Sequence, residues 1–313
     1  MNTLSIAIPT FNRAHALYET LLRIDAVIPI HVPLVIRDNA STDSTLEIVK
    51  KFKSDSKREV IVNTNDQNMG IDYNIIKVVE DVSTDYVWLL GDDDSFTDNA
   101  YERYVSILNS YKNIGLIFSN YSVWDNIFLD CLKSNVFDQK EDVYFADGRD
   151  IINIVGELLS VLSCLVIRKK EFIEALAIKP IALTGTAVDF VWCLSHILTK
   201  SSAYYVGTAL INWRSGDEDR GFSWTRLTQP YLQAIKPATD GRPDLAMAAK
   251  RLCLERSLVG KIRATRISGN LSFAGRIQVL TSLFPIFFGF RVYWTRVIPW
   301  LLFPYQLIKL VRE

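Results

Sequence analysis

The chain lacks most of the residues and patterns on which zinc sites, disulfide frameworks and secretion depend. It has three histidines and four cysteines in 313 residues, and the cysteines (Cys131, Cys164, Cys193 and Cys253) are far apart. Without a CxxC or Cys/His spacing, we expect no zinc site and four reduced core cysteines, as in a cytosolic protein. The N-terminus has no basic segment followed by an apolar one, so we expect no signal peptide.

The chain also lacks a net charge and an uninterrupted apolar run of the ~18–20 residues that a spanning helix needs. With 49% hydrophobic and 22% charged residues, the composition is that of a globular protein. The charge is uneven, because residues 257–313 contain eight basic residues and one acidic residue, a net charge of +7, which leaves −7 for the rest. This asymmetry indicates an anionic partner for the C-terminal segment.

What the sequence does contain is an apolar, β-prone run, Tyr86–Leu90, followed by glycine and then Asp92, Asp93 and Asp94. Ligands of open α/β sheets bind at the C-terminal ends of such strands. Three adjacent carboxylates repel one another unless a cation lies among them, and Mg²⁺ and Mn²⁺ take carboxylate oxygens and are completed by substrate phosphates. The motif predicts a metal ion that holds a phosphorylated substrate. The alternative is an acidic loop that caps the helix after Ser95.

Residues 1–123 are expected to alternate strands with amphipathic helices, which predicts a doubly wound α/β domain with a parallel sheet. The expected strands are Leu4–Pro9, Val32–Ile36, Val60–Val62, Tyr86–Leu90 and Gly115–Ser119, and the helices cover about 13–27, a segment capped by Ser41 or Thr42, 71–82 and 99–111. Residues 124–225 are less regular, with helices expected at Ile151–Leu159 and Asp189–Leu198 and strands at Val161–Ile167 and Tyr204–Trp213. The chain is helical from about Thr228.

Polar residues follow each of the first four expected strands. The residues of these four segments that we assign to the site are, in chain order, Pro9, Thr10, Phe11, Asn12 and Arg13; Asp38; Asn68 and Gly70; and Asp92, Asp93 and Asp94. Because the C-terminal ends of parallel strands meet at one crevice, we expect these residues to converge. A nucleotide bound there would find Asp38 as an acceptor for a base N–H, helix N-termini for its phosphates and a metal at the acids for its diphosphate.

The motifs Ile-Pro-Thr-Phe-Asn-Arg, Asp-Asn-Ala-Ser-Thr-Asp, Asn-Met-Gly and Gly-Asp-Asp-Asp, in this order and spacing, resemble family 2 glycosyltransferases with the GT-A fold. The resemblance covers residues 1–125 strongly and 126–225 loosely, and Trp88–Asp94 is most similar to the abequosyltransferase-like group of bacterial polysaccharide enzymes. It implies an inverting transfer from a nucleotide-sugar, with the acids as a DxD-type motif for Mn²⁺ or Mg²⁺. The commoner family form has an acid where Gly91 stands, so the ligand is open; we favour Asp94, with Asp92 or Asp93 near the ribose or as a second metal contact.

An inverting transfer needs a general base that deprotonates the acceptor hydroxyl. In the family this acid lies well downstream of the metal motif, often as Glu-Asp at the start of a helix. Thr184–Asp189 fits this pattern, with Val188 in place of the glutamate, so the resemblance implies that Asp189 is the base. The alternative for Asp189 is a helix cap.

The segment from Asn212 to Trp224 mixes charge, glycine and aromatic residues after an expected strand. We interpret it as a loop that closes on the donor, with Arg214 or Arg220 on the diphosphate and Trp224 against a sugar. A surface hairpin loop is the alternative. The Gln-x-x-Arg-Trp motif of processive relatives is absent, which favours the addition of a single sugar.

The C-terminal segment is apolar and aromatic from Val279 onward, and prolines and arginines interrupt it. Tryptophan and tyrosine are residues of the bilayer interface, and basic side chains bind anionic headgroups. We therefore expect segments that lie in the membrane surface. The alternative is a C-terminal core or an oligomer contact.

Together these features predict a GT-A domain at 1–225, with 1–123 binding the nucleotide-sugar and 124–225 the acceptor, and a helical region at 226–313 with membrane-surface segments. The expected partners are a nucleotide-sugar, a glycan acceptor on polyprenyl diphosphate and an anionic membrane surface, with no nucleic acid. The expected place is the cytoplasmic, inner face of the plasma membrane. The alternatives are a sugar-phosphate nucleotidyltransferase, which normally carries a Gly-rich phosphate loop, and a nucleotide-sugar-binding protein that has lost catalysis.

Overall fold

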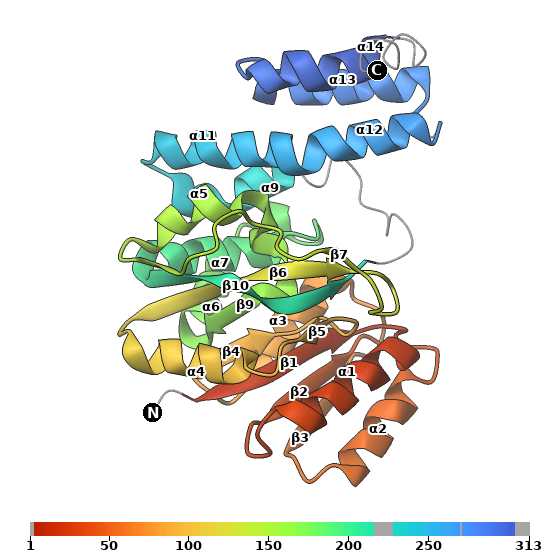
Figure 1. Cartoon of the computed structure of the whole chain (residues 1–313), viewed down its shortest axis with the longest axis vertical. Coiled ribbons are helices and arrows are strands. Elements are labelled where there is room, and N and C mark those ends of the chain that lie inside the picture. The colour runs from red at the N-terminus through yellow and green to blue at the C-terminus, as the bar shows by residue number, and fades with distance from the viewer. Residues whose placement is uncertain (1–2, 216–227, 270, 304–313) are drawn as a thin grey trace.

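The computed structural model describes residues 3–215, 228–269 and 271–303, and over these ranges its centre is a ten-stranded mixed sheet (Figure 1). The main path of the sheet runs β3-β2-β1-β4-β9-β6-β10-β5, while β7 pairs with β6 and β8 with β10. The strands are β1 (Leu4–Thr10), β2 (Leu34–Asp38), β3 (Val60–Thr64), β4 (Tyr86–Leu89), β5 (Ser95–Phe96), β6 (Ile114–Trp124), β7 (Cys131–Lys133), β8 (Val143–Phe145), β9 (Leu165–Arg168) and β10 (Ser202–Arg214).

The sheet is parallel only in part. Strands β3, β2, β1 and β4 are parallel neighbours, as predicted. Strand β9 then lies antiparallel between β4 and β6, which the expectation of a parallel sheet did not include. Leu165, Val166 and Ile167 of β9 are all fully buried, which suits a strand covered on both faces. The result is a mixed sheet with four parallel and five antiparallel pairings, in which the Rossmann-like parallel part expected for the GT-A fold lies at β3, β2, β1 and β4.

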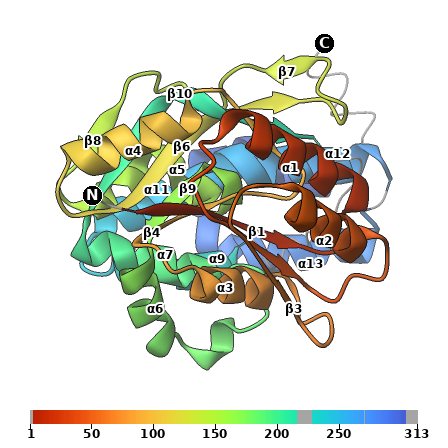
Figure 2. The ribbon, with the colours of Figure 1, turned by 90° about the horizontal axis from the view of Figure 1, so that it is seen from below.

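Helices cover both faces of the sheet, with α3, α6 and α7 on one face and α1, α2 and α4 on the other (Figure 2). Their bounds are α1 Ala14–Val27, α2 Thr45–Asp55, α3 Ile71–Asp81, α4 Ala100–Ser110, α6 Lys169–Ala177 and α7 Asp189–Lys200. The prediction that Ser41 or Thr42 caps α2 is wrong. Ser41 is bound to the Asp38 carboxylate and the Thr42 backbone N–H donates to Asn12 Oδ1, so the chain makes a turn there and Ser44 precedes the helix.

The segment expected to be one helix at Ile151–Leu159 is divided into short pieces. They are the 3₁₀ turn Gly148–Ile151, α5 (Ile152–Val155) and the 3₁₀ turn Gly156–Ser160, and a further 3₁₀ turn, Leu162–Cys164, precedes β9. Gly156 has φ +54°, and a Cβ there would lie 2.8 Å from Cβ of Leu252. The break therefore lets α11 (Pro243–Leu252) approach the sheet domain closely.

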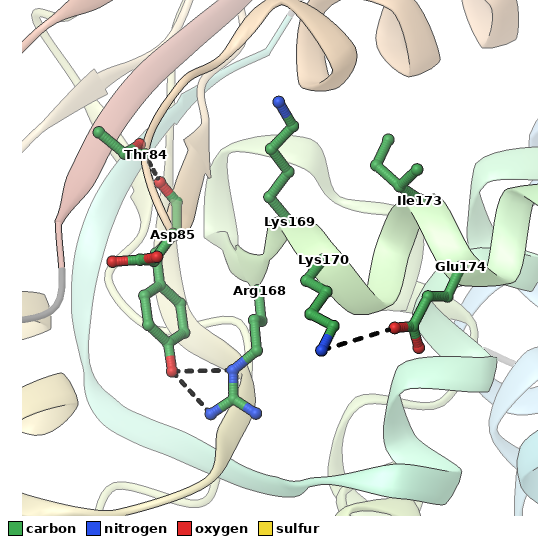
Figure 3. Close-up of a pocket in the computed structure, with 8 residues that line it drawn as sticks. Thr84, Asp85, Arg168, Lys169, Lys170, Ile173 and Glu174 are labelled. Carbon is green, nitrogen blue, oxygen red and sulfur yellow. Dashed lines mark hydrogen bonds and ion pairs between the residues drawn. The ribbon is translucent and has the colours of Figure 1, made fainter.

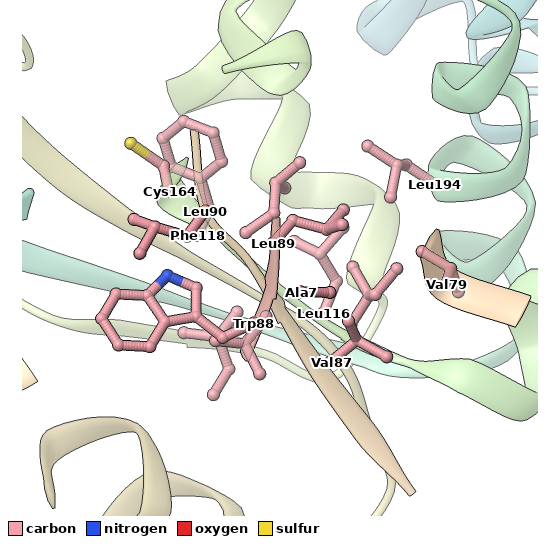
Figure 4. Packing of buried hydrophobic residues seen from close by; sticks show 14 of the residues in the cluster. Ala7, Val79, Val87, Trp88, Leu89, Leu90, Leu116, Phe118, Cys164 and Leu194 are labelled. Carbon is pink, nitrogen blue, oxygen red and sulfur yellow. The ribbon is translucent and has the colours of Figure 1, made fainter. Parts of the chain in front are cut away.

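The main hydrophobic core surrounds β4 (Figure 4). Trp88 is fully buried, and its ring meets Phe96 and Tyr104 edge to face at 5.1 Å between centroids. Its indole N–H donates to the carbonyl of Ser163 at 2.9 Å. These contacts fix the position of β4, and therefore also the position of the residues that follow it.

The C-terminal helices are α9 (Gln229–Ala234), α10 (Lys236–Thr239), α11, α12 (Val259–Ile267), α13 (Phe273–Phe287) and α14 (Ile298–Leu302), and a π-helical turn, Cys253–Leu258, joins α11 to α12. The part from Cys253 onward forms a second, smaller core. In Figure 1, α11 and α12 form a layer between the sheet domain and α13–α14. The first core extends to Ala249, and the second begins at Cys253.

Three of the four cysteines are buried, as expected, and one is exposed. Cys164, Cys193 and Cys253 are buried free thiols, but Cys131 is exposed on β7, so its assignment to the core is wrong. β7 pairs only at the periphery of the sheet, where its apolar sequence context does not lead to burial.

None of the helices in the described ranges is long and apolar enough to span a bilayer.

Gly156→Ala tests the close approach of α11. We expect the free energy of unfolding to fall by about 2–4 kcal/mol, because the methyl group adds overlap with Leu252 to the cost of a left-handed backbone. Gly241→Ala is the matched control, since Gly241 has φ +68° and nothing within 4 Å of its Cβ position. Urea unfolding of both variants measures the difference, and equal losses would show that the contact is unimportant.

Candidate active site

The three consecutive aspartates lie at the C-terminal end of β4, and the chain then pairs with the end of β10. Phe96 is paired with Ile211 and Ser95 with Asn212 in an antiparallel bridge. This pairing places Arg214, at the end of β10, beside the aspartates. Two predicted parts of the site that are far apart in sequence therefore meet.

Asp94 is held in place by two donors and is only 5% exposed. The Ser163 hydroxyl donates to its Oδ2, and the backbone N–H of Arg214 donates to Oδ1 at 3.1 Å. Burial and then the negative charge of Asp93 raise the pKa of Asp94 to about 7, although the bonds from Ser163 and Arg214 oppose the shift. A nearby cation would offset this burden of negative charge.

Gly91 lies where the packing leaves no room for a side chain. Its backbone N–H donates to Ser163 Oγ at 2.8 Å, and a Cβ there would lie 2.9 Å from Asp94 Oδ2. The glycine leaves room for Asp94 and Ser163 to contact each other. Ser163 was not predicted, because its place comes from the 3₁₀ turn before β9 and from its bond to Trp88.

Asp92 is bound by the residues that follow β1. The Thr10 hydroxyl donates to Asp92 Oδ2 at 2.7 Å, and Arg13 Nε lies 3.9 Å from Oδ1. Thr20 of α1, which was not predicted, places its hydroxyl 3.2 and 3.1 Å from the carbonyl oxygens of Asp92 and Asp94. The predicted convergence of the first and fourth strand ends is thus present in the structure.

Arg214 is bound to the acidic segment through its side chain as well as its backbone. Its Nε donates to the Asp93 carbonyl at 2.8 Å, and Nη2 pairs with Glu19 of α1 at 2.6 Å. The guanidinium lies 4.5 Å from the ring centroid of Phe128. A cation fixed beside three carboxylates can stabilise a diphosphate.

Asp38, predicted to accept a base N–H, is fully buried in a turn of its own. Ser41 donates to it through both its hydroxyl and its backbone N–H. Asn12, with φ +52°, bridges the same turn by accepting from Thr42 and donating its backbone N–H to Ser41 Oγ. Pro9 continues β1 in register with Arg37, and Phe11 is 37% exposed.

Asn68 and Gly70 belong to a network of amide side chains that sets the start of α3. Asn39 donates to Asn68 Oδ1 at 2.9 Å and to the Gly70 carbonyl at 3.2 Å. Asn65 donates to Asn39 and to Asn74, at 2.8 and 3.1 Å. Asn68 therefore holds its own loop against β2, and the network joins the ends of β2 and β3 to α3.

Asp189, the predicted base, is the first residue of α7 and is 2% exposed. Its Oδ2 is 2.5 Å from Nζ of Lys179, and both side chains are buried. Asp72, in the first turn of α3, accepts the Ala187 backbone N–H at 2.6 Å and interacts with Asp189. Neither Lys179 nor Asp72 was predicted, since Asp72 reaches Asp189 through the contact of α3 with α7, and Lys179 comes from the segment after α6.

The donor set at the acids is suited to a hard divalent cation. Asp92 and Asp94 supply carboxylate oxygens, and a cation beside them would oppose the rise that burial and then the charge of Asp93 cause in the pKa of Asp94. Within the described residues, no group of three or more His, Cys, Asp or Glu side chains could hold a metal. A cation there would need substrate phosphates to complete its shell. Arg220 and Trp224 lie outside the described residues.

A hollow of about 590 Å³ lies at the opposite, N-terminal end of β4 (Figure 3). Its lining residues are Thr84, Asp85 and Tyr86, Arg168 at the end of β9, and Lys169, Lys170, Ile173 and Glu174 of α6. Arg168 bonds to the Tyr86 hydroxyl, and Lys169 donates to the Glu80 and Val82 carbonyls. The hollow is therefore separate from the strand ends that carry the predicted site.

Comparison with known proteins gives the same family as the motifs. The model of glycosyl transferase family 2 matches residues 5–157. Abequosyltransferase RfbV of Salmonella typhimurium is 25% identical over 251 residues, which are 76% of this chain and 74% of the relative.

Solved structures show the fold. Residues 1–349 of S. aureus TarS in complex with UDP-GlcNAc align with a TM-score of 0.59 at 13% identity, covering 90% of this chain and 85% of that one. The chain covers 46% of the longer TarS structure. Mannosyltransferase PcManGT of Pyrobaculum calidifontis, in complex with GDP-Man and Mn²⁺, aligns with a TM-score of 0.56 at 16% identity, covering 96% and 85%. These similarities identify residues 5–157 as a glycosyl transferase family 2 domain, and they support a family 2 glycosyltransferase with the GT-A fold.

Proposed function

We propose that this glycosyltransferase moves a single sugar from a nucleotide-sugar to a bacterial surface-polysaccharide acceptor, with inversion at the anomeric carbon. The observation that carries the proposal is the meeting of Thr10, Asp92, Asp94 and Arg214 at one edge of the sheet. Structures of the same fold hold UDP-GlcNAc or GDP-Man, which supports a nucleotide-sugar donor. The similarity to an abequosyltransferase supports a polysaccharide acceptor.

The donor is proposed to lie across the ends of β1, β2 and β4. The residues assigned to it are Pro9, Thr10, Phe11, Asn12, Arg13, Asp38, Asn68, Gly70, Asp92, Asp93, Arg214, Arg220 and Trp224. Asp38 and Asn68 are engaged in their own loops, so their proposed role is to shape the nucleotide pocket. Arg214, which lies among the acids, is proposed to bind the diphosphate.

Mn²⁺ or Mg²⁺ would be held by Asp94 and Asp92. When bound, such a cation neutralises charge on the leaving diphosphate. Ser163 and Thr20 keep the two aspartates in position, and Thr10 and Arg13 orient the Asp92 carboxylate. The Mn²⁺ in the mannosyltransferase complex supports the assignment.

Asp189 is proposed as the general base that takes the proton of the acceptor hydroxyl. Lys179 holds one of its carboxylate oxygens. A base must come within hydrogen-bond reach of the hydroxyl, and Asp189 is 2% exposed. The proposal therefore requires that the segment before α7, residues 178–188, moves when the acceptor binds and exposes Asp189. This segment carries the 90% exposed Ile181.

The C-terminal region, 226–313, is proposed to hold the enzyme on the inner face of the plasma membrane, beside a polyprenyl-diphosphate-linked acceptor. Exposed apolar residues at helical spacing form a stripe along α13 and beyond it, namely Phe273, Ile277, Phe284, Phe288 and Trp294. Arg291 and Arg296 are exposed close by in the sequence. An apolar stripe beside basic residues fits a helix that lies in an anionic interface.

A panel of nucleotide-sugars tests the function as a whole. Purified protein with Mn²⁺ should release nucleotide from one donor when a glycan acceptor is present. Binding without release would favour the alternative of an inactive nucleotide-sugar-binding protein. The nucleotidyltransferase alternative is not supported by the family match, and formation of a nucleotide-sugar from a sugar phosphate would be its sign.

Asp94→Asn tests the metal. We expect the fold to be kept and turnover to fall about 10²-fold or more, because charge neutralisation of the leaving group is worth several kcal/mol. Asp98→Asn is the control, since that side chain is 83% exposed. Steady-state kinetics with Mn²⁺ and with excess EDTA measure the effect. Full activity of Asp94→Asn, or of the wild type in EDTA, would contradict the assignment.

Asp189→Asn tests the base. Transfer should be abolished while donor affinity stays nearly unchanged, since the base acts on the acceptor. Calorimetric titration with the donor, beside turnover assays, separates the two effects. Loss of donor affinity together with turnover would make Asp189 a donor-site or structural residue.

Phe273→Ser with Phe288→Ser tests the membrane surface. Binding to vesicles should weaken whatever their charge, because buried apolar area is not screened by salt. Arg291→Glu with Arg296→Glu should weaken binding to anionic vesicles selectively, since each basic residue contributes about 1 kcal/mol there. Leu22→Ser, at an exposed position of α1, is the control. Co-sedimentation with liposomes measures binding, and a wild type that stays in the supernatant would refute this proposal.

A further inference from the structure

Asp72 is a buried carboxyl group to which neither the sequence motifs nor the proposed donor site gives a role. It lies in the first turn of α3 and is 4% exposed. Its Oδ2 accepts the backbone N–H of Ala187 at 2.6 Å. No ion pair of Asp72 occurs among the described residues. A carboxyl group buried in this way needs another partner.

Asp189 is the group that Asp72 meets. The Ala187 N–H that Asp72 binds lies two residues before Asp189, and α3 packs against α7, so the two carboxyl groups interact. Asp189 is 2% exposed, and its Oδ2 is the oxygen that binds Lys179. Lys179 also reaches Thr184 Oγ1 at 3.3 Å, so its position is fixed from two sides.

One oxygen of each carboxyl group remains without a donor. Oδ1 of Asp72 and Oδ1 of Asp189 are both buried, and neither has a hydrogen-bond partner among the described donors. Two ionised carboxylates cannot donate to each other, so both oxygens would be unsatisfied and the charges would repel. A single proton between them satisfies both oxygens at once.

The charges of Asp72, Asp189 and Lys179 also favour one proton on the pair of carboxyl groups. Two carboxylates and the Lys179 ammonium would leave one net negative charge in the interior, and a proton on the pair removes it. Burial and then the charge of Asp189 raise the pKa of Asp72 to about 7. Cys193, the other titratable group that interacts with Asp189, stays a neutral thiol because burial raises its pKa to about 12.

We propose that Asp72 and Asp189 share one proton in the folded protein, and that Asp72 is a positioning residue that holds the Asp189 carboxylate for proton transfer. Protonated Asp72 donates to Asp189 while Lys179 holds its other oxygen. The orientation of Asp189 is then fixed from both sides. The catalytic meaning rests on the proposed function, whereas the sharing of the proton does not.

Asp72→Asn tests the shared proton, because the amide can donate to Asp189 and accept from Ala187 as the protonated acid does. Because the folded pair keeps a proton that the unfolded aspartates release, the contribution of the pair to stability should be greatest below about pH 4 and fall as pH rises to about 7. In that window, the slope of the unfolding free energy against pH should change by about one proton in Asp72→Asn. Asp55→Asn, at an exposed position of α2, should leave the slope unchanged.

Turnover gives a second readout that a merely structural role would not move. Asp72→Ala leaves Asp189 without its donor and should lower kcat about tenfold or more, while Asp72→Asn should retain most of the kcat at neutral pH. Donor KM should stay the same in both variants. Equal losses of kcat in the two variants would overturn the positioning role.

The outcomes separate this inference from the proposed function. An unchanged pH slope in Asp72→Asn, with Asp189→Asn inactive, would refute the shared proton and keep the base. A changed slope, with Asp189→Asn still active, would keep the shared proton and refute the base. If Asp72→Asn fails to fold, ¹³C NMR of labelled aspartate carboxyls in the wild type decides. A coupled pair titrating near neutral pH supports sharing, and independent titration at ordinary values overturns it.

Discussion

The site depends on the cost of burying the Asp94 carboxyl group at the end of β4. A carboxylate cannot be nearly excluded from water unless donors compensate for the lost hydration. Ser163 comes from the turn before β9, and the Arg214 backbone N–H comes from the end of β10. The two strands that bring these donors enter the sheet from the second half of the chain, so the chain beyond residue 157 is needed to complete a motif that lies in the first half.

Hydrogen bonds also compensate for the burial of amide side chains on the other side of the site, in the loops after β2 and β3 and at the start of α3. Asn39, Asn65 and Asn74 are buried, and each amide both donates and accepts within the network. Such a network tolerates little rearrangement, because a half-satisfied amide in the interior is costly. It therefore sets where α3 begins, and the start of α3 sets where Asp72 meets α7. The hydrogen bonds of the loops after β2 and β3 therefore influence the surroundings of the proposed base, Asp189.

Much of this could be predicted from the sequence, for reasons that are local. The apolar strand Tyr86–Leu89, the helix Ala14–Val27 and the acids after β4 follow from periodicity and from the abrupt change to charge. What could not be predicted depends on contacts between distant segments. The insertion of β9 between β4 and β6 leaves no periodic signal, and the single residues Ser163 and Lys179 look like any serine or lysine of a loop until the tertiary fold places them.

The helical run from Pro243 to Ile267 has a consequence for how the molecule unfolds. Ala249 packs in the first core, and Cys253, one turn later on the same run, packs in the second. Arg256 donates to the Ile154 carbonyl, and Ser257 binds Glu157, so the run is also tied sideways to the sheet domain. Neither core can lose this run alone without exposing apolar surface of the other. The two cores therefore form one cooperative unit, with a single unfolding transition in place of two.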